Sequence, residues 1–192
     1  MPEAAPSPSQ PSDSFPDRIQ EALFFSRTVL LFGEIEQKLA RTVTAQLLAL
    51  AAANSEPIRL LVNSPGGHVE SADTIHDVIR YVNADVTIVG TGWVASAAAL
   101  VYIAVPRERR LALPNTRFLL HQPLGATQGP ASDVEIEAAQ ILSIRSRLNR
   151  LFSEATGQPL EKVRADTDRN HWMTAEEAIA YGLVGALTTR AR

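Results

Sequence analysis

Strand-like and helix-like segments alternate along most of this chain, and this alternation limits the folds that it can adopt. Short runs rich in β-branched and aliphatic residues lie at 28–32, 58–62, 86–89, 111–113 and 117–120. Longer segments with apolar residues at helical spacing lie at 37–53, 69–82 and 132–156. Parallel neighbouring strands need crossover connections, and helices of this length supply them. The sequence therefore predicts an α/β layered domain with a largely parallel sheet.

Two capping patterns in the sequence predict where helices begin. Each has a serine or threonine followed three residues later by glutamate, which lets side chains satisfy backbone N–H groups of the first turn. The two pairs are Ser132 with Glu135, and Thr174 with Glu177. Gly157 and Gly182 follow the corresponding apolar stripes, and glycine is favoured just beyond a helix end. We expect one long helix from Ser132 to Gly157 and a short one from Thr174 to Gly182.

The start of the chain differs from the rest in composition. Residues 1–16 contain five of the twelve prolines, together with serine and acidic residues. Such a segment cannot bury enough apolar surface to offset the entropy of ordering it. We expect a flexible Pro/Ser-rich tail at 1–16 and a single domain at 17–192, which begins with a short helical segment at 17–25.

Charge and composition exclude several function classes. The net charge of -3 gives no electrostatic basis for binding nucleic acid. The chain has no cysteine, so disulfides and thiolate metal sites are absent and a reducing compartment is expected. The longest apolar candidate, 94–105, is about half of the roughly 20 residues that a membrane-spanning helix needs. We see no leader-like basic and apolar region, and we expect a cytoplasmic protein that binds no membrane.

Ser96 is a candidate nucleophile because of its position between a strand and a helix. Segment 90–100, GTGWVASAAAL, passes from an apolar strand through glycines into a helix of small residues. Unpaired N–H groups and the helix dipole at such a start favour the negative charge that serine attack creates. On spacing alone, a plain helix cap is the commoner role for such a serine. The G-x-S-x-G signature of a nucleophile elbow is also absent.

His121 is a candidate general base at the end of the strand expected at 117–120. A neutral imidazole can accept a serine proton near pH 7, although a histidine packed in the core is the simpler interpretation. We expect His76 on a helix surface and His68 facing solvent, and His171 is a third competitor. No pair of histidines has the H-E-x-x-H spacing of a zinc site, and no metal is expected.

The paired glycines Gly66 and Gly67 follow Pro65 in a predicted turn. Without a Cβ, their backbone N–H groups can approach a ligand closely. This turn fits one half of an oxyanion hole, and it fits an ordinary tight turn equally well.

Four blocks taken together are specific to one family. They are VNSPGG (62–67), GWVASAAAL (92–100), LPNTRFLLHQPLGATQGPASDVEIEA (113–138) and GLV (182–184). In order and spacing, the chain from about 27 to 187 resembles the Clp protease proteolytic subunit family, ClpP. The resemblance implies a serine endopeptidase in which Ser96 is the nucleophile and His121 the base. It also implies an oxyanion hole formed by the N–H groups of Gly67 and Ala97.

The resemblance also implies an architecture and a set of partners. It implies a crotonase-like α/β fold with a protruding helical handle, formed by 125–129 and the helix from Ser132. Such subunits form stacked heptameric rings, either homo- or hetero-oligomeric, around a chamber. An AAA+ unfoldase uses ATP to feed unfolded polypeptides into it, and the proteolytic subunit itself needs no cofactor.

This sequence departs from the family pattern at the third catalytic position. The family has aspartate there, whereas this chain has Asn170. The amide oxygen can orient the His121 ring but adds no negative charge, so slow or conditional activity is expected. A neighbouring carboxylate, Asp166 or Asp168, is an alternative partner for the histidine.

The positions used for unfoldase docking also differ. Family members often carry exposed aromatic residues where this chain has Arg59 and Leu61, although Tyr81 keeps one. Two alternatives therefore remain beside the active peptidase. One is a weakly active or regulatory subunit of a mixed ring, and the other is an acyl-CoA enzyme on the same crotonase-like scaffold.

Overall fold

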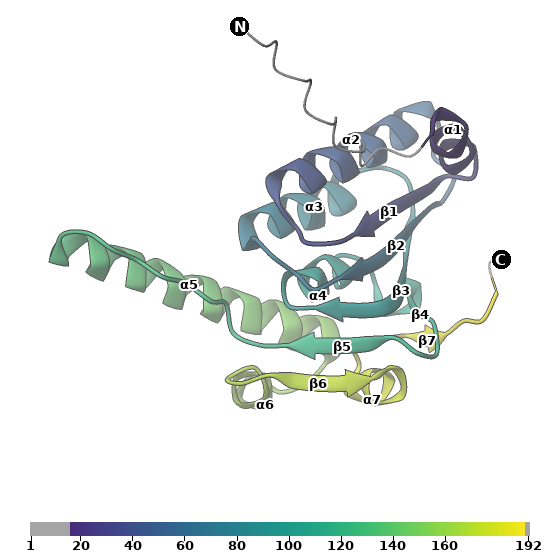
Figure 1. Cartoon of the computed structure of the whole chain (residues 1–192). Coiled ribbons are helices and arrows are strands. Elements are labelled where there is room, and N and C mark those ends of the chain that lie inside the picture. The colour runs from purple at the N-terminus through teal and green to yellow at the C-terminus, as the bar shows by residue number, and fades with distance from the viewer. Residues whose placement is uncertain (1–15, 191–192) are drawn as a thin grey trace, which may run out of the picture.

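A computed structural model describes residues 16–190 of the chain, and a mixed seven-stranded sheet forms its centre (Figure 1). The tail expected at 1–16 lies outside the described residues, except for Pro16. The strands are β1 (Thr28–Phe32), β2 (Ile58–Ser64), β3 (Val86–Ala95), β4 (Arg110–Ala112), β5 (Arg117–Leu120), β6 (His171–Thr174) and β7 (Ala186–Leu187). The helices are α1 (Asp17–Phe25), α2 (Gln37–Ala53), α3 (Val69–Tyr81), α4 (Ala97–Tyr102), α5 (Ala131–Thr156), α6 (Leu160–Asp166) and α7 (Ala175–Tyr181).

All neighbouring strands are parallel except β5 and β6, so the predicted parallel-dominated α/β sheet is confirmed. The order β1-β2-β3-β4-β7 forms the main path, and β5 and β6 branch from β3. Strand β3 is longer than the expected 86–89 because it changes partner along its length. Its first half, at 88–90, pairs with β4, and its end, at 93–95, pairs with β5. This branch carries the chain directly into Ser96.

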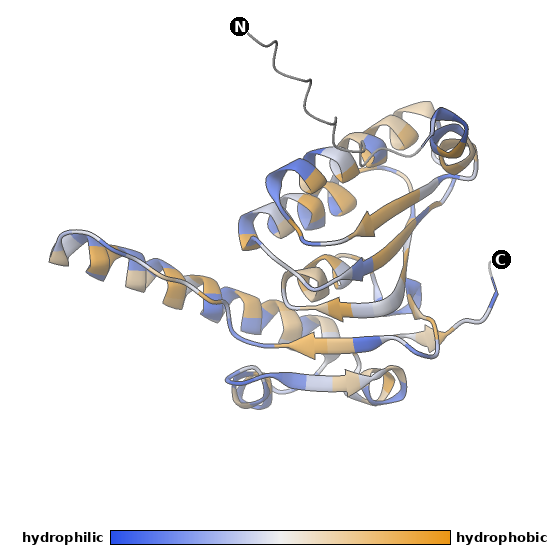
Figure 2. Cartoon of the chain, viewed as in Figure 1, coloured by the Kyte–Doolittle hydropathy of each residue, from blue (hydrophilic) through white to orange (hydrophobic). Residues whose placement is uncertain are grey.

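The core lies between the sheet and the helices that pack against it. Strand burial alternates cleanly in β2, where every second side chain from Ile58 to Ser64 is buried. The largest side chains with almost no exposure include Leu31, Ile88, Tyr102 and Phe118. Figure 2 shows the same pattern, with apolar ribbon along the strands and polar positions on the outer sides of the helices. The short helix α4, which lies within the apolar run at 94–105, is buried along its whole length.

Helix α5 projects from the body as a long arm (Figure 1). It has 26 residues and so extends roughly 39 Å at 1.5 Å per residue. Its buried residues all lie in its second half, from Leu148 onward, and the first half stands clear of the core. This arm is the helical handle that the resemblance implied.

The two predicted capping boxes have different outcomes. The box at Thr174 is present, with the Glu177 N–H donating to the threonine hydroxyl and the Thr174 N–H donating to the glutamate. The box at Ser132 is wrong, because α5 begins one residue earlier, after Pro130, without a side-chain cap. A proline before the first turn gives the same start without a capping side chain, since its ring fixes φ near -65°.

The ends of these two helices were predicted correctly, and one α-helix and two strands were not predicted. Gly157 and Gly182 both end helices in the left-handed region, with φ of 74° and 91°. The unpredicted elements are α6, β6 and β7, which have seven, four and two residues. Segments this short show too few turns or alternations for a periodic signal, and tertiary pairing determines them.

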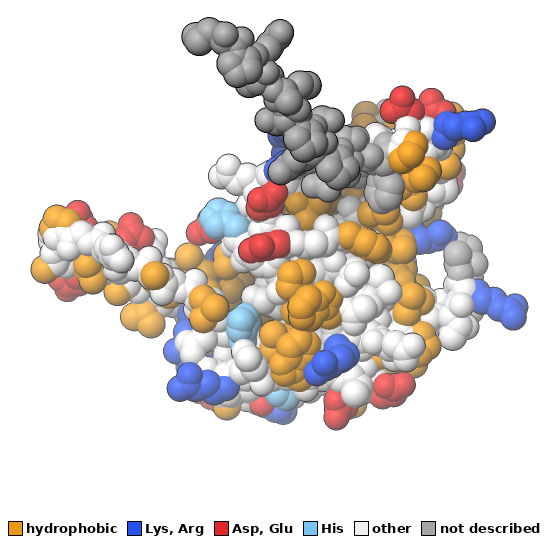
Figure 3. Space-filling view, in the orientation of Figure 1, with side chains coloured by type: hydrophobic (Ala, Val, Ile, Leu, Met, Phe, Trp, Pro, Cys, Tyr) orange, Lys and Arg blue, Asp and Glu red, His pale blue; other side chains and the backbone are white. Residues whose placement is uncertain are grey.

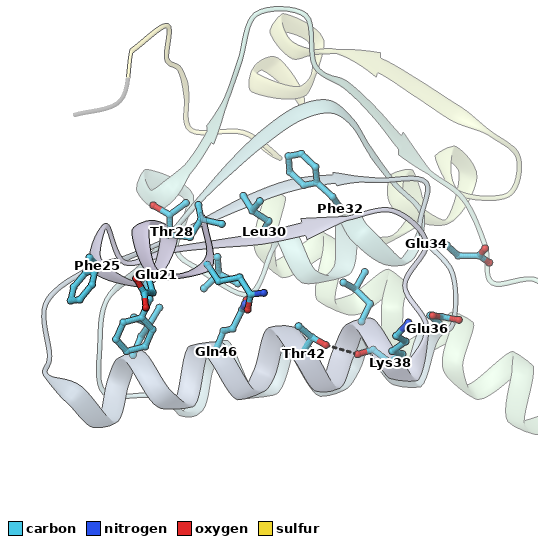
Figure 4. Close-up of a pocket in the computed structure, with 16 residues that line it drawn as sticks. Glu21, Phe25, Thr28, Leu30, Phe32, Glu34, Glu36, Lys38, Thr42 and Gln46 are labelled. Carbon is cyan, nitrogen blue, oxygen red and sulfur yellow. Dashed lines mark hydrogen bonds between the residues drawn. The ribbon is translucent and has the colours of Figure 1, made fainter. Parts of the chain in front are cut away.

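A groove of about 1230 Å³ lies between α1, β1 and α2 (Figure 4). Phe24, Phe32 and Leu39 are among the residues that line it, and α1 itself has no buried residue. None of the predicted site residues belongs to this groove.

Candidate active site

Ser96 stands at the sharp turn between β3 and α4. Its backbone has φ 56° and ψ -122°, a conformation that non-glycine residues rarely adopt and that costs about 1–3 kcal/mol. Two hydrogen bonds hold it, from the Ser96 N–H to the Leu119 carbonyl at 2.9 Å and from the Ala99 N–H to the Ser96 carbonyl at 2.9 Å. A strained strand-to-helix turn that presents a serine is the shape of a nucleophile elbow, although the glycine signature is missing.

His121 follows the end of β5, and its ring meets the serine. The distance between His121 Nε2 and Ser96 Oγ is 2.7 Å, so the hydroxyl can donate its proton to that nitrogen. Both residues are partly exposed. Because Ser96 is bonded to β5 two residues before His121, the same strand fixes both ends of this hydrogen bond.

Asn170 lies on the other side of the imidazole ring. Its Oδ1 is 3.2 Å from His121 Nδ1, and an amide oxygen only accepts, so Nδ1 carries the proton. Nε2 is then the unprotonated nitrogen that faces Ser96, which is the tautomer that a general base requires. The structure thus brings Ser96, His121 and Asn170 into one chain of hydrogen bonds.

The segment before Asn170 is tied to the residue after His121. The Gln122 N–H donates to the Thr167 carbonyl at 2.6 Å, and the Gln122 side chain donates to the Asp168 carbonyl at 2.7 Å. Thr167 is buried, and its hydroxyl lies within hydrogen-bonding distance of the Val163 carbonyl at 2.8 Å and of Asn149 Oδ1 at 2.9 Å. The role of Gln122 was not predicted, because a glutamine beside a histidine carries no local signature of it.

Neither neighbouring carboxylate is hydrogen-bonded to His121, so the alternative partners are not supported. Asp166 accepts from Lys162 at 2.7 Å and from Tyr181 at 2.8 Å. Burial raises the pKa of this carboxyl, but the two hydrogen bonds and the Lys162 charge outweigh burial and leave the pKa below its usual value. Asp168 accepts from Arg145 at 2.9 Å. Both carboxylates are therefore paired with groups other than His121.

The glycine turn packs directly against the serine. A Cβ on Gly66 would lie 2.7 Å from Ser96 Cβ and 3.0 Å from the Ala97 nitrogen. Residue Ile35 fixes the turn, donating to the Gly66 carbonyl at 2.7 Å and accepting from the residue after Gly67 at 2.8 Å. Within residues 16–190, the N–H groups of Gly67 and Ala97 donate to no protein acceptor. Two available donors therefore lie on residues adjacent to the contact between Gly66 and Ser96, which is the kind of donor pair that an oxyanion hole uses.

The other histidines lie outside this arrangement. His76 was expected on a helix surface, and this prediction is wrong. The residue is only 7% exposed and lies on the core side of α3. The His68 side chain is 54% exposed, and it contacts Ser71 and Glu70. The His171 ring packs against Tyr181.

The part of the chain that the structure describes has neither a cluster of metal-ligating side chains nor a membrane-spanning helix. No group of three or more histidine, cysteine or acidic side chains is placed to hold a metal ion among residues 16–190. No helix in that range is long and apolar enough to cross a membrane.

A serine hydroxyl bonded to an oriented imidazole, with free N–H groups beside it, defines the class of serine hydrolases that work through an acyl-enzyme. Comparison with known proteins narrows the class. The sequence profile described as Clp protease matches residues 12–191. This chain belongs to the Clp protease family, and the resemblance predicted from its sequence blocks is confirmed.

Similar proteins carry consistent names. The chain is 61% identical over 167 residues to the ATP-dependent Clp protease proteolytic subunit 3 of Rhizobium meliloti (strain 1021), covering 87% of this chain and 86% of the relative. It is 49% identical over 175 residues to the ATP-dependent Clp protease proteolytic subunit 2 of Pseudomonas aeruginosa, covering 91% and 87%.

A solved structure has the same fold. It is a ClpP1 variant from Listeria monocytogenes that carries an asparagine-to-aspartate substitution. The TM-score is 0.84 at 46% sequence identity, with 90% of this chain and 96% of that chain covered. The predicted crotonase-like, ClpP-type fold is thereby confirmed.

Proposed function

We propose that this chain is a proteolytic subunit of an ATP-dependent Clp-type serine protease and that it cleaves peptide bonds of unfolded polypeptides. The observation that carries the proposal is the 2.7 Å contact between Ser96 Oγ and His121 Nε2. Membership in the Clp protease family supports the peptidase over an acyl-CoA enzyme on a related scaffold.

The mechanism follows from which atoms face one another. Ser96 Oγ attacks the scissile carbonyl while His121 Nε2 takes its proton, and the Gly67 and Ala97 N–H groups stabilise the oxyanion. His121 then gives the proton to the leaving amine, and an acyl-enzyme on Ser96 remains. A water molecule, deprotonated by His121, attacks the ester, and the proton returns to Ser96 as the acid leaves. Asn170 keeps the imidazole in the tautomer that both steps need.

Asn170 supports a second candidate function, a weakly active or regulatory subunit of a mixed ring. An amide holds the ring but contributes no charge to stabilise imidazolium. Relatives named proteolytic subunit 2 and subunit 3 suggest that such chains occur in numbered sets. We expect the homo-oligomer to hydrolyse peptides slowly and a second subunit to increase the rate.

Exposed apolar surface supports assembly into a ring. Phe25 on α1 is 82% exposed beside the groove, and Ile136 and Leu142 on the projecting part of α5 are 58% and 62% exposed. Apolar area of this kind is covered in stable oligomers. We propose that α1 with its groove packs on a neighbouring subunit and that α5 packs on the opposing ring, in stacked heptamers.

The remaining partner is an AAA+ unfoldase that hydrolyses ATP, while this subunit needs no cofactor. Tyr81 at the end of α3 is 81% exposed and available for a peptide loop. Arg59 and Leu61 on β2 replace aromatic positions used for docking in the family, so weaker docking to this subunit is expected. A cytoplasmic location agrees with these partners.

A fluorophosphonate probe tests the proposal directly. The assembled wild-type protein should be labelled at Ser96, and Ser96→Ala should abolish labelling. Ser71→Ala is the matched control, because Ser71 Oγ also contacts a histidine, His68 Nδ1 at 2.9 Å, but lies within α3 and not at a strained strand-to-helix turn. Labelling that survives in Ser96→Ala would place the nucleophile elsewhere.

A further inference from the structure

Two exposed indoles stack on the sheet beside the candidate site. The ring centroids of Trp93 on β3 and Trp172 on β6 are 6.5 Å apart, and their planes differ by 10°. The guanidinium carbon of Arg117 lies 4.5 Å from the Trp172 ring centroid. The two tryptophans remain 43% and 37% exposed. We call these three residues the indole patch.

The strand register puts the indole patch on the same sheet face as His121 and Asn170. Trp172 pairs with Leu119, and the next pair joins the buried side chains of Phe118 and Met173. Because side chains alternate between faces, Trp172 and Leu119 point away from that core layer. His121 and Asn170 each lie two residues beyond this pair, and so return to the same face.

The alternation of side chains along a strand places the second indole, Trp93, on the same face. Trp93 pairs with Arg117, and the next pair joins Val94 to the buried Phe118. Trp93 and Arg117 therefore also point away from the core layer. Figure 3 shows hydrophobic side chains gathered beside a histidine over β3, β5 and β6.

A local irregularity in the strand positions Trp93. Gly92, just before it, has φ +59°, and a Cβ there would lie 2.7 Å from Asn63 Oδ1. That oxygen accepts the Trp93 N–H at 3.4 Å, where the register of β2 against β3 shifts. Bulges of this kind redirect a side chain next to active sites. The exposed indole is thus held by specific contacts.

The distance from the site fits a substrate residue near the scissile bond. Trp172 is two residues along the strand from Asn170, about 7 Å at 3.3–3.4 Å per residue. Trp93 is three residues before Ser96, about 10 Å by the same rise. An extended polypeptide with its scissile carbonyl at Ser96 would reach the indole patch about two to four residues away.

We propose that the indole patch is a subsite for an aromatic side chain of the polypeptide substrate, two to four residues from the bond that is cut. This inference rests on the proposed peptidase function. An aromatic ring gains stacking contact with the indoles, and the Arg117 guanidinium adds a cation for the ring face. The occupant is the substrate, because the indole patch is continuous with the surface that must hold the scissile bond.

Intrinsic fluorescence tests binding without catalysis. The whole chain contains two tryptophans, and both are in the indole patch, so all indole emission reports on it. The assembled Ser96→Ala protein is titrated with tryptophan-free peptides that carry p-iodophenylalanine, or alanine in its place. Saturable quenching by the iodinated peptide alone is expected. Absence of quenching, or indoles that acrylamide cannot reach in the assembled particle, would overturn the proposal.

Peptide selectivity supplies the second measurement. For two fluorogenic peptides that differ only by phenylalanine or alanine three residues from the cleaved bond, we expect kcat/KM to favour phenylalanine by about tenfold, the value of a good aromatic contact. The ratio should fall toward one in Trp93→Leu and in Trp172→Leu, with folding checked by circular dichroism. Leu48→Ala, an exposed apolar residue on α2, should keep the wild-type ratio.

The two measurements separate failure of the subsite from failure of the peptidase. Quenching by the iodinated peptide, with no hydrolysis by the wild-type protein, would show aromatic binding at the indole patch but refute both the proposed function and a role of the patch in cleavage. Hydrolysis with an unchanged ratio in both tryptophan variants would support the function and refute the subsite.

Discussion

Replacing Asn170 with aspartate adds one negative charge beside the His121 imidazole, which becomes positive in the proposed mechanism. In the structure the amide oxygen is 3.2 Å from His121 Nδ1. Two unit charges at that separation attract by about 1.3 kcal/mol at the dielectric constant of water and about 5 kcal/mol at an effective value of 20. Because Asn170 is exposed, the lower part of this range applies.

The substitution also removes an unproductive state of the site. If the amide of Asn170 rotates, its NH₂ group faces His121 Nδ1 and the imidazole proton moves to Nε2. That nitrogen can then no longer accept from Ser96. A carboxylate has two acceptor oxygens and no donor, so Asn170→Asp keeps the productive tautomer in every rotation.

We expect Asn170→Asp to raise kcat/KM on a short fluorogenic peptide by roughly tenfold to a hundredfold, since each 1.36 kcal/mol is a factor of ten in rate. The rate of fluorophosphonate labelling at Ser96 should rise in parallel. Asn115→Asp is the matched control, because it adds the same charge at an exposed asparagine between β4 and β5. An unchanged rate in Asn170→Asp, or an equal gain in the control, would refute the reasoning.

Two further predictions concern the supports of the site. Gly66→Ala should abolish labelling of Ser96 while circular dichroism shows that the fold is retained, because the new Cβ would lie 2.7 Å from both the Ala95 carbonyl oxygen and Ser96 Cβ. The control is Gly33→Ala, which also has positive φ but open space around it and should still be labelled. Loss of labelling in both variants would assign the effect to backbone strain alone. Asp166→Asn should lower the free energy of unfolding in urea by about 1–3 kcal/mol at pH 7, the worth of hydrogen bonds to a charged group. Since the folded pKa of Asp166 lies below its unfolded value of about 3.9, this contribution is present above that pH and is lost as the pH falls through the lower folded pKa. A difference that stays constant down to pH 3 would contradict the ionic origin of the stabilisation.

The sequence predicted the elements that carry strong periodic signals. The apolar stripe ending at Gly157, the strand at 28–32 and the helix at 17–25 all appear at or within one residue of their expected ends. These segments are long, or end at residues with a fixed conformational role, so local chemistry determines them. Strand β6 has four residues and forms through pairing with β5, a contact that no local pattern contains.

For the site, the sequence named residues that the structure brings together, but it did not name the contacts that support them. Sequence reasoning brought Ser96, His121 and Asn170 together through family blocks, and their contacts at 2.7 and 3.2 Å agree with that grouping. It could not find the part played by Ile35, because Ile35 acts through backbone hydrogen bonds that any residue type could make. The side-chain bond of Gln122 to the Asp168 carbonyl was missed because a glutamine beside a histidine carries no local signature of it.

The strained backbone conformation of Ser96 is held in place by several separate segments of the chain. A conformation that costs about 1–3 kcal/mol persists only where the surroundings overdetermine it. Three segments do so here: β5 through the Leu119 carbonyl, the turn of Gly66 through direct contact, and α4 through the Ala99 N–H. Because β5 leads directly into His121, and the residue after His121 anchors the segment before Asn170, the groups that hold Ser96 also position His121 and Asn170. The end of β5 therefore links the positions of Ser96, His121 and Asn170.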